Sequence, residues 1–338
     1  MKTIRAVTLK AFGGADMLQI SRIPEVTLSR SNEVLIRVMA AGVNRGDISQ
    51  RRGHYPPPKG SSEILGLEAS GVVVKVGSDV KAFKEGDRVM ALLTGGGYAE
   101  MASAHEGSVM KIPDGYSFVE AAAIPEAFAT AWQALKLLGD VQKDQNVLIH
   151  AGASGVGTAA MQIVEKYFKA TAIATCSPEK IEFCKRYASI VVDRTPDESG
   201  NCFSPKVRSK VGDECINLII DPVVGGRYLE EDGELLAQDG KVVLLAYMGG
   251  SKVSLNIIPF FRKRATVLFT KLRDRSDEYK ADLMGGLEKE IIPYIKKRAI
   301  VPVVQRSFPL EEVAEAHSFI ESNKSTGKVV LTVAEPNE

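Results

Sequence analysis

The sequence predicts an α/β protein in which a doubly wound parallel sheet is joined to a barrel-like β unit. From Asn146 onward, short apolar runs alternate with segments of helical periodicity, the pattern of a parallel sheet with helical crossovers. Before residue 125, the chain instead has short strands, many turns and few helices. The length of 338 residues is sufficient for two domains with a large core.

The first region is expected to form a curved β unit. Lys2–Leu9, Val34–Ala41 and Gly66–Val76 are predicted strands, and the glycines of the last one are typical of a bulged or tightly curved sheet. Asn44–Arg51 is predicted to contain at least one helical turn. Gly53–Pro58 includes three prolines and must be an exposed loop, because proline continues neither ladder.

The second region is expected to contribute six strands with helices between them. The strands are Val147–Ile149, Ala170–Thr175, Ile190–Asp193, Ile216–Asp221, Lys241–Ala246 and Ala265–Thr270. Helices are expected in Ala121–Leu138, in Asp277–Arg298 with an interruption at Pro293, and in Leu310–Ser322, with final strands at Val301–Phe308 and Lys328–Val333. The terminal segment is too short to be a domain. We therefore expect units at 1–125 and 126–275, with 276–338 returning to complete the first.

A strand, a glycine turn and a helix follow one another at Asn146–Phe168. Within this segment, Gly155-Val156-Gly157-Thr158-Ala159-Ala160 fits the G-x-G-x-x-A form of the dinucleotide fingerprint. The first glycine permits the tight turn, the second lets a pyrophosphate approach, and Ala160 lets helix and strand pack closely. The helix N-terminus would face the diphosphate, so Ala153, Ser154, Gly155, Val156 and Gly157 are predicted cofactor contacts.

Charge and composition exclude several classes of protein. The formal net charge is +1, with no acidic or basic tail, so nothing favours a nucleic-acid partner. The four cysteines have neither C-x-x-C nor zinc-ribbon spacing, which is typical of free thiols in a reducing compartment. No apolar run approaches membrane-spanning length. We expect a cytoplasmic protein that acts on a small molecule.

Four segments resemble the zinc-free quinone oxidoreductases of the medium-chain dehydrogenase/reductase superfamily. They are AAGVNRGDISQRRGHYPPP, ILGLEASGVVVKVGSDVKAFKEGDRVMALLTGGGYAE, AAAIPEAFATAWQAL and HAGASGVGTAA. Ile124–Ala127 and Leu272–Arg275 are similar to the tumour-suppressor-inducible branch. The resemblance spans essentially the whole chain. It implies a GroES-like catalytic domain, a Rossmann domain that binds NADPH, and a cleft between them.

Zinc is not expected. The superfamily's alcohol dehydrogenases bind catalytic zinc through Cys, His and Cys, and Asn44 and Leu67 stand at matching positions here. Leu67 cannot be a ligand, an amide is a poor one, and no cysteine precedes Cys176. The acceptor must then be electrophilic by itself, as quinones and conjugated enones are, with position supplied by the enzyme.

Asn44 and Tyr55 occupy the positions that the resemblance assigns to the catalytic site. Tyr55 could donate its hydroxyl or stack on a planar acceptor, or it could be an exposed aromatic residue of the proline loop. Asn44 could instead only cap the following helix. His54 is expected to be solvated and His150 to be held by backbone groups, so neither is predicted to donate a proton.

The cofactor is predicted to be NADPH. An NAD enzyme places a carboxylate about 20 residues after the first glycines, where this chain has Thr175-Cys176-Ser177. Ser177 and Lys180 are candidates for binding the 2′-phosphate, although Ser177 and Pro178 also suit an ordinary helix start. The resemblance adds Arg194, which stands where relatives have a tyrosine against the phosphate and could bind it through its guanidinium. The resemblance adds contacts to the nicotinamide end and one to a phosphate. They are Thr130, Ala246, Tyr247, Met248, Gly249, Leu272 and Asn323, the last a neutral amide where relatives often have a charge.

Three functions remain open: reduction of quinones, reduction of the double bond of enals or enones, and NADPH binding without catalysis. A homodimer is also expected. Lys241–Ala246 and Ala265–Thr270 are apolar strands at the far end of the sheet, where an open edge favours pairing, and the resemblance places a two-fold contact there.

Overall fold

The computed structural model describes residues 2–334. The chain divides into two compact units, and each is described by itself. One contains residues 1–129 together with 272–338, and the other contains 130–271. The boundaries lie at 129/130 and 271/272, whereas the sequence suggested 125/126 and 275/276. We call them the β unit and the Rossmann unit.

The Rossmann unit is built on a parallel sheet of six strands in the order β10-β9-β8-β11-β12-β13. The strands are β8 (Asn146–Ile149), β9 (Thr171–Cys176), β10 (Ile190–Asp193), β11 (Ile216–Asp221), β12 (Leu236–Leu244) and β13 (Thr266–Phe269). In chain order this is 3-2-1-4-5-6, the doubly wound arrangement, so the expected fold class is confirmed. The order reverses between β8 and β11, which is where such sheets bind ligands.

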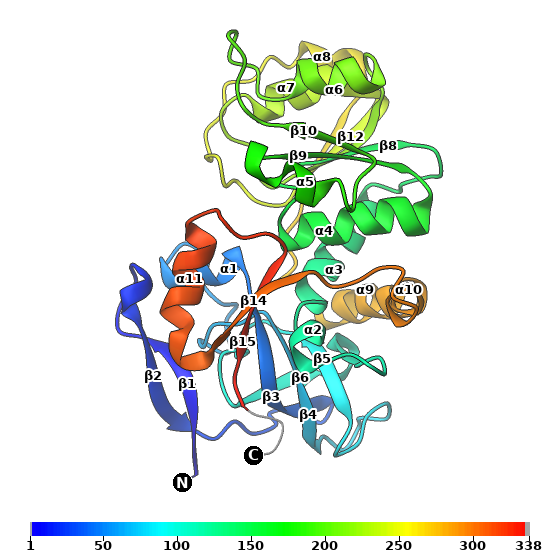
Figure 1. The fold of residues 1–338 in the computed structure, drawn as a ribbon. Coiled ribbons are helices and arrows are strands. Elements are labelled where there is room, and N and C mark those ends of the chain that lie inside the picture. Colours follow the sequence, from blue (N-terminus) through cyan, green and yellow to red (C-terminus); the bar gives the residue numbers. More distant parts are fainter. Residues whose placement is uncertain (1, 335–338) are drawn as a thin grey trace. The chain divides into compact units, whose positions relative to one another are not determined.

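Helices cover both faces of this sheet. They are α4 (Gly155–Gln162), continued by the π-helix η4 (Ile163–Phe168), η5 (Pro178–Lys180), α5 (Ile181–Cys184), α6 (Ser204–Val211), α7 (Tyr228–Leu235) and α8 (Ile258–Arg262). Figure 1 shows α4 and α5 on one face and α6, α7 and α8 on the other. The central strands are apolar because both their faces are buried, as in β11, where five of six residues are buried, whereas the residues of the edge strand β13 are exposed or half-buried.

The β unit contains the remaining strands. They are β1 (Thr3–Leu9), β2 (Leu18–Pro24), β3 (Glu33–Val43), β4 (Glu68–Val76), β5 (Arg88–Leu92), β6 (Met101–His105), β7 (Val109–Lys111), β14 (Val304–Pro309) and β15 (Lys328–Thr332). The main sheet has the order β14-β15-β3-β4-β5-β7, and β6 also pairs with β3. The strand β15 pairs with β3 over Val43–Ala40, so the segment that follows the Rossmann unit completes this sheet.

Glycines curve the β3–β4 pair. The register shifts twice between these strands, as expected for a bulged sheet. A Cβ added at Gly71 would lie 2.0 Å from the carbonyl oxygen of Arg37, so only glycine permits this close approach of the strands. Gly66, which we had placed within the strand, precedes it instead, with φ of 105°.

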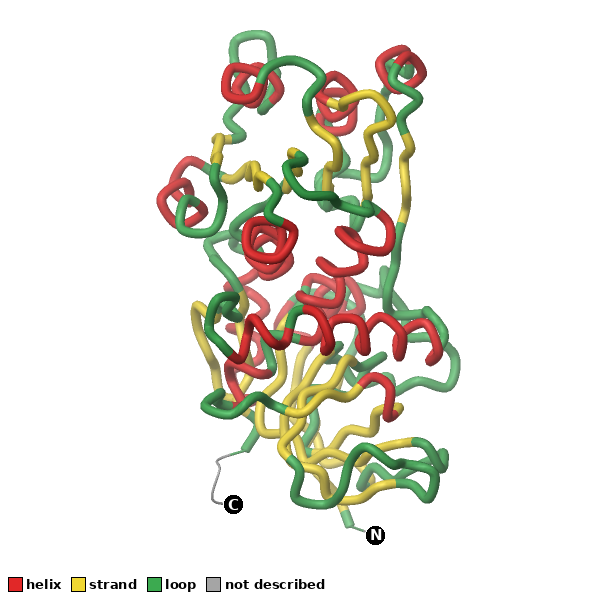
Figure 2. Tube along the Cα trace, turned by 90° about the vertical axis from the view of Figure 1, so that its right-hand side faces the viewer, coloured by secondary structure: helices red, strands yellow, loops and turns green. Residues whose placement is uncertain are grey.

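The helices of the β unit pack against its sheet and are shorter than predicted. They are η1 (Ala15–Met17), α1 (Arg45–Arg51), η2 (Glu106–Ser108), α2 (Phe118–Ala121), α9 (Asp277–Glu290), α10 (Ile292–Lys296), η6 (Leu310–Glu312) and α11 (Val313–Glu321). The helix α3 (Pro125–Trp132) and the π-helix η3 (Gln133–Leu138) follow α2, so the single helix expected at 121–138 is three elements. Pro125 begins α3, and its fixed φ and missing N–H suit a first turn. Figure 2 shows strands and helices along the trace.

Each unit has its own hydrophobic core. In the β unit the core lies between the curved sheet and α11, and includes Val38, Tyr98 and Phe308. In the Rossmann unit it includes Leu148, from the central strand β8, and Phe203. The Tyr98 hydroxyl and other polar groups are buried in the same units, so their partners need an explanation of their own.

Candidate functional site

A buried ion pair lies where β3, β4 and β15 meet in the β unit. The ammonium of Lys328 is 2.6 Å from Glu68 Oε1, and these side chains are 5% and 0% exposed. The same ammonium donates to Asn44 Oδ1 at 2.6 Å and to the carbonyl of Val43 at 3.2 Å. The Asn44 amide donates its Nδ2 to Glu68 at 3.0 Å. Both ends of the Asn44 side chain are therefore held by this ion pair.

The backbone beside Asn44 is held by a second buried carboxylate, Asp47. Its oxygens accept the backbone N–H groups of Asn44 at 2.8 Å and Gly66 at 3.0 Å, and the hydroxyl of Tyr98 at 3.0 Å. Burial raises the pKa of Asp47 to about 6, although these donors lower it. Asn44 is the N-cap residue of α1 and forms a capping box with Asp47, which accepts the Asn44 backbone N–H, so Asn44 both caps the helix and contacts the ion pair.

Tyr55 packs against the same region. A Cβ added at Gly46 would lie 2.9 Å from the side chain of Leu67 and 3.4 Å from the Tyr55 ring, so the ring lies beside Gly46 and Leu67. The guanidinium of Arg273 lies 5.2 Å from the ring centroid and donates to the backbone carbonyl of Tyr55 at 3.1 Å. Tyr55 is half-buried rather than fully exposed. Burial raises the pKa of its hydroxyl well above the usual range, and the charge of Glu126 raises it further.

Arg273 fixes this loop through several bonds. Besides Tyr55, its guanidinium donates to the carbonyl of Thr94 at 2.7 Å and to Gln50 Oε1 at 2.7 Å. Desolvation by burial lowers its pKa. Leu272, which we predicted near the nicotinamide, precedes Arg273 and is buried. The structure thus brings Asn44 and Tyr55 into one unit, together with Leu272.

The residues at the zinc-ligand positions do not fit a zinc ion. Leu67 has no donor atom, and the oxygens of Asn44 and Glu68 already accept from the ammonium of Lys328. Within residues 2–334, no group of three His, Cys, Asp or Glu side chains is arranged to hold a metal.

In the Rossmann unit, the fingerprint forms a tight turn between β8 and α4. Ser154 is the N-cap of α4, and its Oγ accepts the N–H of Gly157 at 3.0 Å. A Cβ added at Gly157 would lie 2.5 Å from the carbonyl oxygen of Gly152. The absence of a side chain at Gly157 therefore lets the helix pack closely on the turn. This role adds to the predicted one, which is to let a pyrophosphate approach the backbone. Ala153 is buried, and Gly155 and Val156 form the first turn of α4.

Two basic side chains and a hydroxyl gather at the ends of β9 and β10. Arg194 Nη2 donates to Ser177 Oγ at 3.3 Å, and its backbone N–H donates to the carbonyl of Cys176 at 2.9 Å. Desolvation lowers the pKa of Lys180, and the positive charge of Arg194 lowers it as well, whereas Glu179 raises it. Two cations that lie close enough to repel each other would both be stabilised by an anion between them.

The predicted nicotinamide contacts follow β12. Ala246, Tyr247, Met248 and Gly249 form a loop in which Met248 and Gly249 donate their N–H groups to the carbonyls of Pro222 and Val223, after β11. The loops after β11 and β12 therefore meet at the carboxyl edge of the sheet.

Two further predicted contacts lie elsewhere. Thr130, within α3, is the first residue of the Rossmann unit. Asn323 belongs to the β unit, follows α11 with φ of 59°, and accepts from Arg45.

His54 and His150, neither of which is predicted to donate a proton, have different surroundings. His54 is exposed, as expected. The backbone N–H of His150 donates to the carbonyl of Ile220 at 3.0 Å, in line with the expected backbone hydrogen bonds. Its ring, in addition, has side-chain partners: it lies 2.8 Å from Thr175 Oγ1 and 2.8 Å from Asp232 Oδ1, which α7 supplies. Burial lowers the pKa of His150 to about 4.

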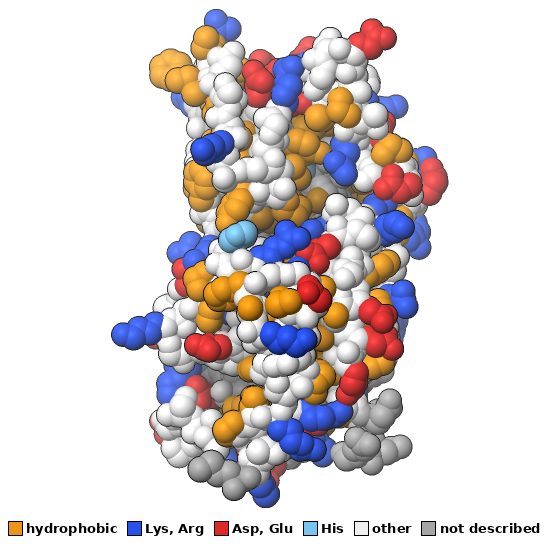
Figure 3. Space-filling view, turned by 90° about the vertical axis from the view of Figure 1, so that its left-hand side faces the viewer, with side chains coloured by type: hydrophobic (Ala, Val, Ile, Leu, Met, Phe, Trp, Pro, Cys, Tyr) orange, Lys and Arg blue, Asp and Glu red, His pale blue; other side chains and the backbone are white. Residues whose placement is uncertain are grey.

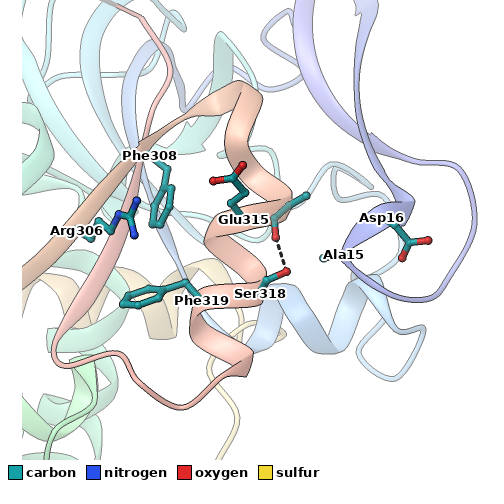
Figure 4. Close-up of a pocket in the computed structure, with 8 residues that line it drawn as sticks. Ala15, Asp16, Arg306, Phe308, Glu315, Ser318 and Phe319 are labelled. Carbon is teal, nitrogen blue, oxygen red and sulfur yellow. Dashed lines mark hydrogen bonds between the residues drawn. The ribbon is translucent and has the colours of Figure 1, made fainter.

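A surface pocket of the β unit lies apart from these residues. It has a volume of about 450 Å³ and is lined by residues from η1, β14 and α11, including Asp16, Arg306 and Glu315. Figure 4 shows Arg306 beside Phe308 and Phe319 on one side of it. None of the predicted site residues lines it.

Four residues of the β unit that contact the candidate site were not selected as site residues from the sequence. They are Glu68, Glu126, Arg273 and Lys328. Three of them lie in the segments that carry the family resemblance, and this position was the only indication of a site role that the sequence offered for them. Lys328 has the pattern of an ordinary strand residue. Their importance depends on contacts between residues as distant as Glu68 and Lys328, which no local pattern shows.

Two domain families match the chain. Residues 30–114 match the alcohol dehydrogenase GroES-like domain, and residues 188–331 match a family described as zinc-binding dehydrogenase. The human protein named quinone oxidoreductase is 32% identical over 340 residues, covering 98% of each chain.

Two solved structures extend this similarity. The CurK enoyl reductase has a TM-score of 0.85 at 26% identity and covers 98% of this chain and 100% of its own. The quinone oxidoreductase of Pseudomonas syringae pv. Tomato DC3000 has a TM-score of 0.83 at 26% identity, with the same coverage. The fold, the fingerprint turn and these full-length similarities establish that the chain belongs to the medium-chain dehydrogenase/reductase superfamily, a family of oxidoreductases that bind a nicotinamide cofactor.

Proposed function

We propose that this protein reduces quinones by transferring a hydride from NADPH without a metal ion. The observation that carries the proposal is the ammonium of Lys328, which binds Asn44 Oδ1 and Glu68 Oε1 next to Leu67. An amide that is bound to a fixed cation and an alkyl group stand at the zinc-ligand positions, so the protein has no Lewis acid to activate an alcohol or a simple carbonyl at this place. A quinone needs no such activation. The relatives named quinone oxidoreductase support this class of acceptor.

The residues of the β unit would then bind and orient the acceptor. Bound NADPH supplies the hydride. The Tyr55 ring, fixed by Arg273, offers a planar surface for a quinone ring and a hydroxyl to its carbonyl. Asn44, with both ends of its amide engaged, acts by holding Glu68 and Lys328 in place. Positioning of this kind accounts for a large part of the rate in reactions that need no further chemical activation.

The preference for NADPH over NADH is supported by Ser177, Lys180 and Arg194. A 2′-phosphate placed against them would accept from the hydroxyl and offset the repulsion between the two cations. Lys180→Ala, alone and with Arg194→Ala, should raise the KM for NADPH at least tenfold, about 1.4 kcal/mol per decade. The KM for NADH should stay nearly constant. Equal weakening of both cofactors, or a wild type that prefers NADH, would contradict this assignment.

The acceptor is tested by NADPH oxidation with an ortho-quinone, a para-quinone and a medium-chain enal. We expect turnover with a quinone. Tyr55→Ala should lower kcat/KM for quinones by about 1–3 kcal/mol of transition-state binding while changing cofactor affinity less. The zinc content of the same protein should be measured by elemental analysis. A zinc content near one equivalent, together with an activity that requires this zinc, would refute the metal-free proposal.

Reduction of an enal or enone double bond is the alternative reaction. The similarity to the CurK enoyl reductase favours it, since that enzyme's name describes the reduction of a conjugated double bond. Preference for the enal over both quinones would establish this alternative. If none of the three compounds is reduced, the protein binds NADPH without catalysis.

We also propose a homodimer formed through the edge of the Rossmann sheet. The edge strand β13 and the segment before it expose large hydrophobic side chains. They are Phe261 (84% exposed), Phe269 (78%), Ile257 (65%), Tyr247 (62%) and Ile258 (53%). Covering them with a second copy would remove an apolar surface that monomeric proteins rarely expose. Phe261→Glu should produce monomers in sedimentation experiments, and a wild type that is monomeric at micromolar concentration would refute the proposal.

The remaining expectations concern location and partners. Within residues 2–334, no helix has the length and apolarity needed to cross a bilayer. On the face drawn in Figure 3, Lys and Arg side chains lie among Asp and Glu side chains and form no continuous basic area. All four cysteines are free. These observations support the proposal of a cytoplasmic enzyme for small molecules, without a nucleic-acid partner.

A further inference from the structure

The turn that follows β11 contains a residue in an unfavourable backbone conformation. Val224 has φ of 64°, in the left-handed region. No other β-branched residue among those the structure describes has a positive φ. A branched Cβ crowds the backbone in this region, so a valine stays there only if its surroundings hold it. The side chain of Val224 is buried in the core of the Rossmann unit.

The carboxylate of Asp221 holds this turn. Its Oδ1 accepts the backbone N–H of Val223 at 2.6 Å and that of Val224 at 3.0 Å, and its Oδ2 accepts the N–H of Val224 at 3.0 Å. Asp221 is the last residue of β11 and is fully buried. Hydrogen bonds to an ionised carboxylate are stronger than those between neutral groups. These bonds therefore oppose the strain at Val224 and keep it in the left-handed region.

The same turn carries the loop that follows β12. The carbonyl of Val223 accepts the N–H of Gly249 at 2.8 Å, and the carbonyl of Pro222 accepts the N–H of Met248 at 3.1 Å. Gly225 packs directly against the loop, since a Cβ added there would lie 1.9 Å from the carbonyl oxygen of Gly249. Met248 and Gly249 are exposed. An exposed loop is thus attached to a strained turn, and the turn to a buried carboxylate.

We propose that Asp221 is a positioning residue for the nicotinamide end of the cofactor. It keeps Val224 in the left-handed region and thereby places the loop 246–249 at the carboxyl edge of the sheet. This inference rests on the proposed function, because it takes NADPH as the cofactor and this loop as its nicotinamide contact. A loop that is free to move would have to be ordered during binding, so a loop that is held beforehand binds more tightly.

The first test compares two ligands of the wild type and of Asp221→Ala by calorimetry. NADPH contains the nicotinamide ring, and 2′-phospho-ADP-ribose is the same molecule without it. The variant should raise the Kd for NADPH roughly tenfold or more, and that for 2′-phospho-ADP-ribose less than about threefold. A general loss of structure would weaken both ligands alike, so this difference identifies a positioning role.

Asp221→Asn is the conservative variant for this test. Its remaining oxygen can accept both N–H groups, as Oδ1 of Asp221 does. The Kd for NADPH should therefore stay within about threefold of the wild-type value, since the loop remains ordered before binding.

The second test uses the strain itself. Glycine enters the left-handed region without a Cβ penalty. Val224→Gly, added to Asp221→Ala, should therefore lower the Kd for NADPH about threefold or more relative to Asp221→Ala alone, although it removes a second buried side chain. Val224→Ala, added to the same variant, is the matched control and should give no such recovery, because alanine keeps its Cβ. Two losses that simply add in the glycine variant would contradict the inference.

Gly225→Ala tests the contact between turn and loop without changing the buried carboxylate. Its Cβ would collide with the carbonyl of Gly249, so the loop must move and the Kd for NADPH should rise roughly tenfold. Gly285→Ala in α9 is the control, because a Cβ there meets nothing within 4 Å. Its affinities should match those of the wild type.

Hydrogen exchange measures the position of the loop without a ligand. In Asp221→Ala, the amides of Met248 and Gly249 should exchange roughly tenfold faster than in the wild type. If Asp221→Ala does not fold, Asp221→Ser replaces it in both measurements, because its hydroxyl can still accept one N–H of the turn, more weakly than the carboxylate.

The outcomes separate this inference from the proposed function. If the wild type binds neither NADPH nor 2′-phospho-ADP-ribose, the proposed function fails, and hydrogen exchange still decides whether Asp221 holds the loop. If the wild type binds both and the Asp221 variant weakens both equally, or neither, Asp221 does not position the nicotinamide end and the inference is wrong.

Discussion

Replacing Lys328 with Met tests how the buried ion pair stabilises the β unit. The substitution keeps most of the side-chain stem and removes an ammonium with contacts at 2.6, 2.6 and 3.2 Å. Glu68, fully buried, would keep two donors, the Asn44 amide and the Glu126 N–H, but would lose its counter-charge. Breaking a buried pair in this way costs about 3–5 kcal/mol. Because two donors remain, we expect about 3 kcal/mol, roughly a 100-fold change in the unfolding equilibrium.

Hydrogen exchange resolved by peptide measures this loss in the affected unit. Amides of β3, β4 and β15 should exchange about 100-fold faster in the variant, while those of the Rossmann sheet should keep their rates. The double variant Lys328→Met/Glu68→Gln should recover part of the stability, since no charge is then left buried. A loss below about 0.5 kcal/mol in the single variant, or strictly additive losses in the double one, would refute the role assigned to the pair.

Three other substitutions test the local structure. His150 has its pKa lowered from 6.5 to about 4, so its contribution to stability is complete above pH 6.5 and is lost as the pH falls towards 4. The wild type should therefore lose roughly 2 kcal/mol between pH 7 and pH 5 through this residue, and His150→Gln should lose less, as followed by the fluorescence of Trp132. Gly157→Val should weaken NADPH binding at least tenfold in calorimetry, because its Cβ would lie 2.5 Å from a backbone oxygen; unchanged binding would show that the turn can adjust. Arg273→Met should raise the KM for quinones about tenfold, or 1.4 kcal/mol, and speed exchange in the loop of Tyr55, with NADPH affinity as the control that should not change.

The fold class could be predicted from the sequence because its signals are local. The apolar runs of the Rossmann strands and the glycines between β8 and α4 reflect backbone needs within a few residues, such as burial on both faces of a strand or the absence of a Cβ. The same local reasoning proposes Ser177 and Lys180 as phosphate contacts, because a strand end and the following helix start lie close in sequence. Arg194, which donates to Ser177, is proposed from the resemblance instead. It also recognised that Leu67 cannot be a metal ligand.

The tertiary structure decided the chemistry of the buried polar residues. By pattern, Lys328 is a residue of an ordinary strand and Glu126 an ordinary first-turn acid. Only the pairing of β15 with β3 brings Lys328 to Asn44 and Glu68, across 260 or more positions of the chain. The physical reason is that pKa values and ion pairs depend on distance and burial in space. The sequence by itself therefore determined the architecture and the cofactor turn, whereas only folding determined which polar side chains are buried together and which ion pair they form.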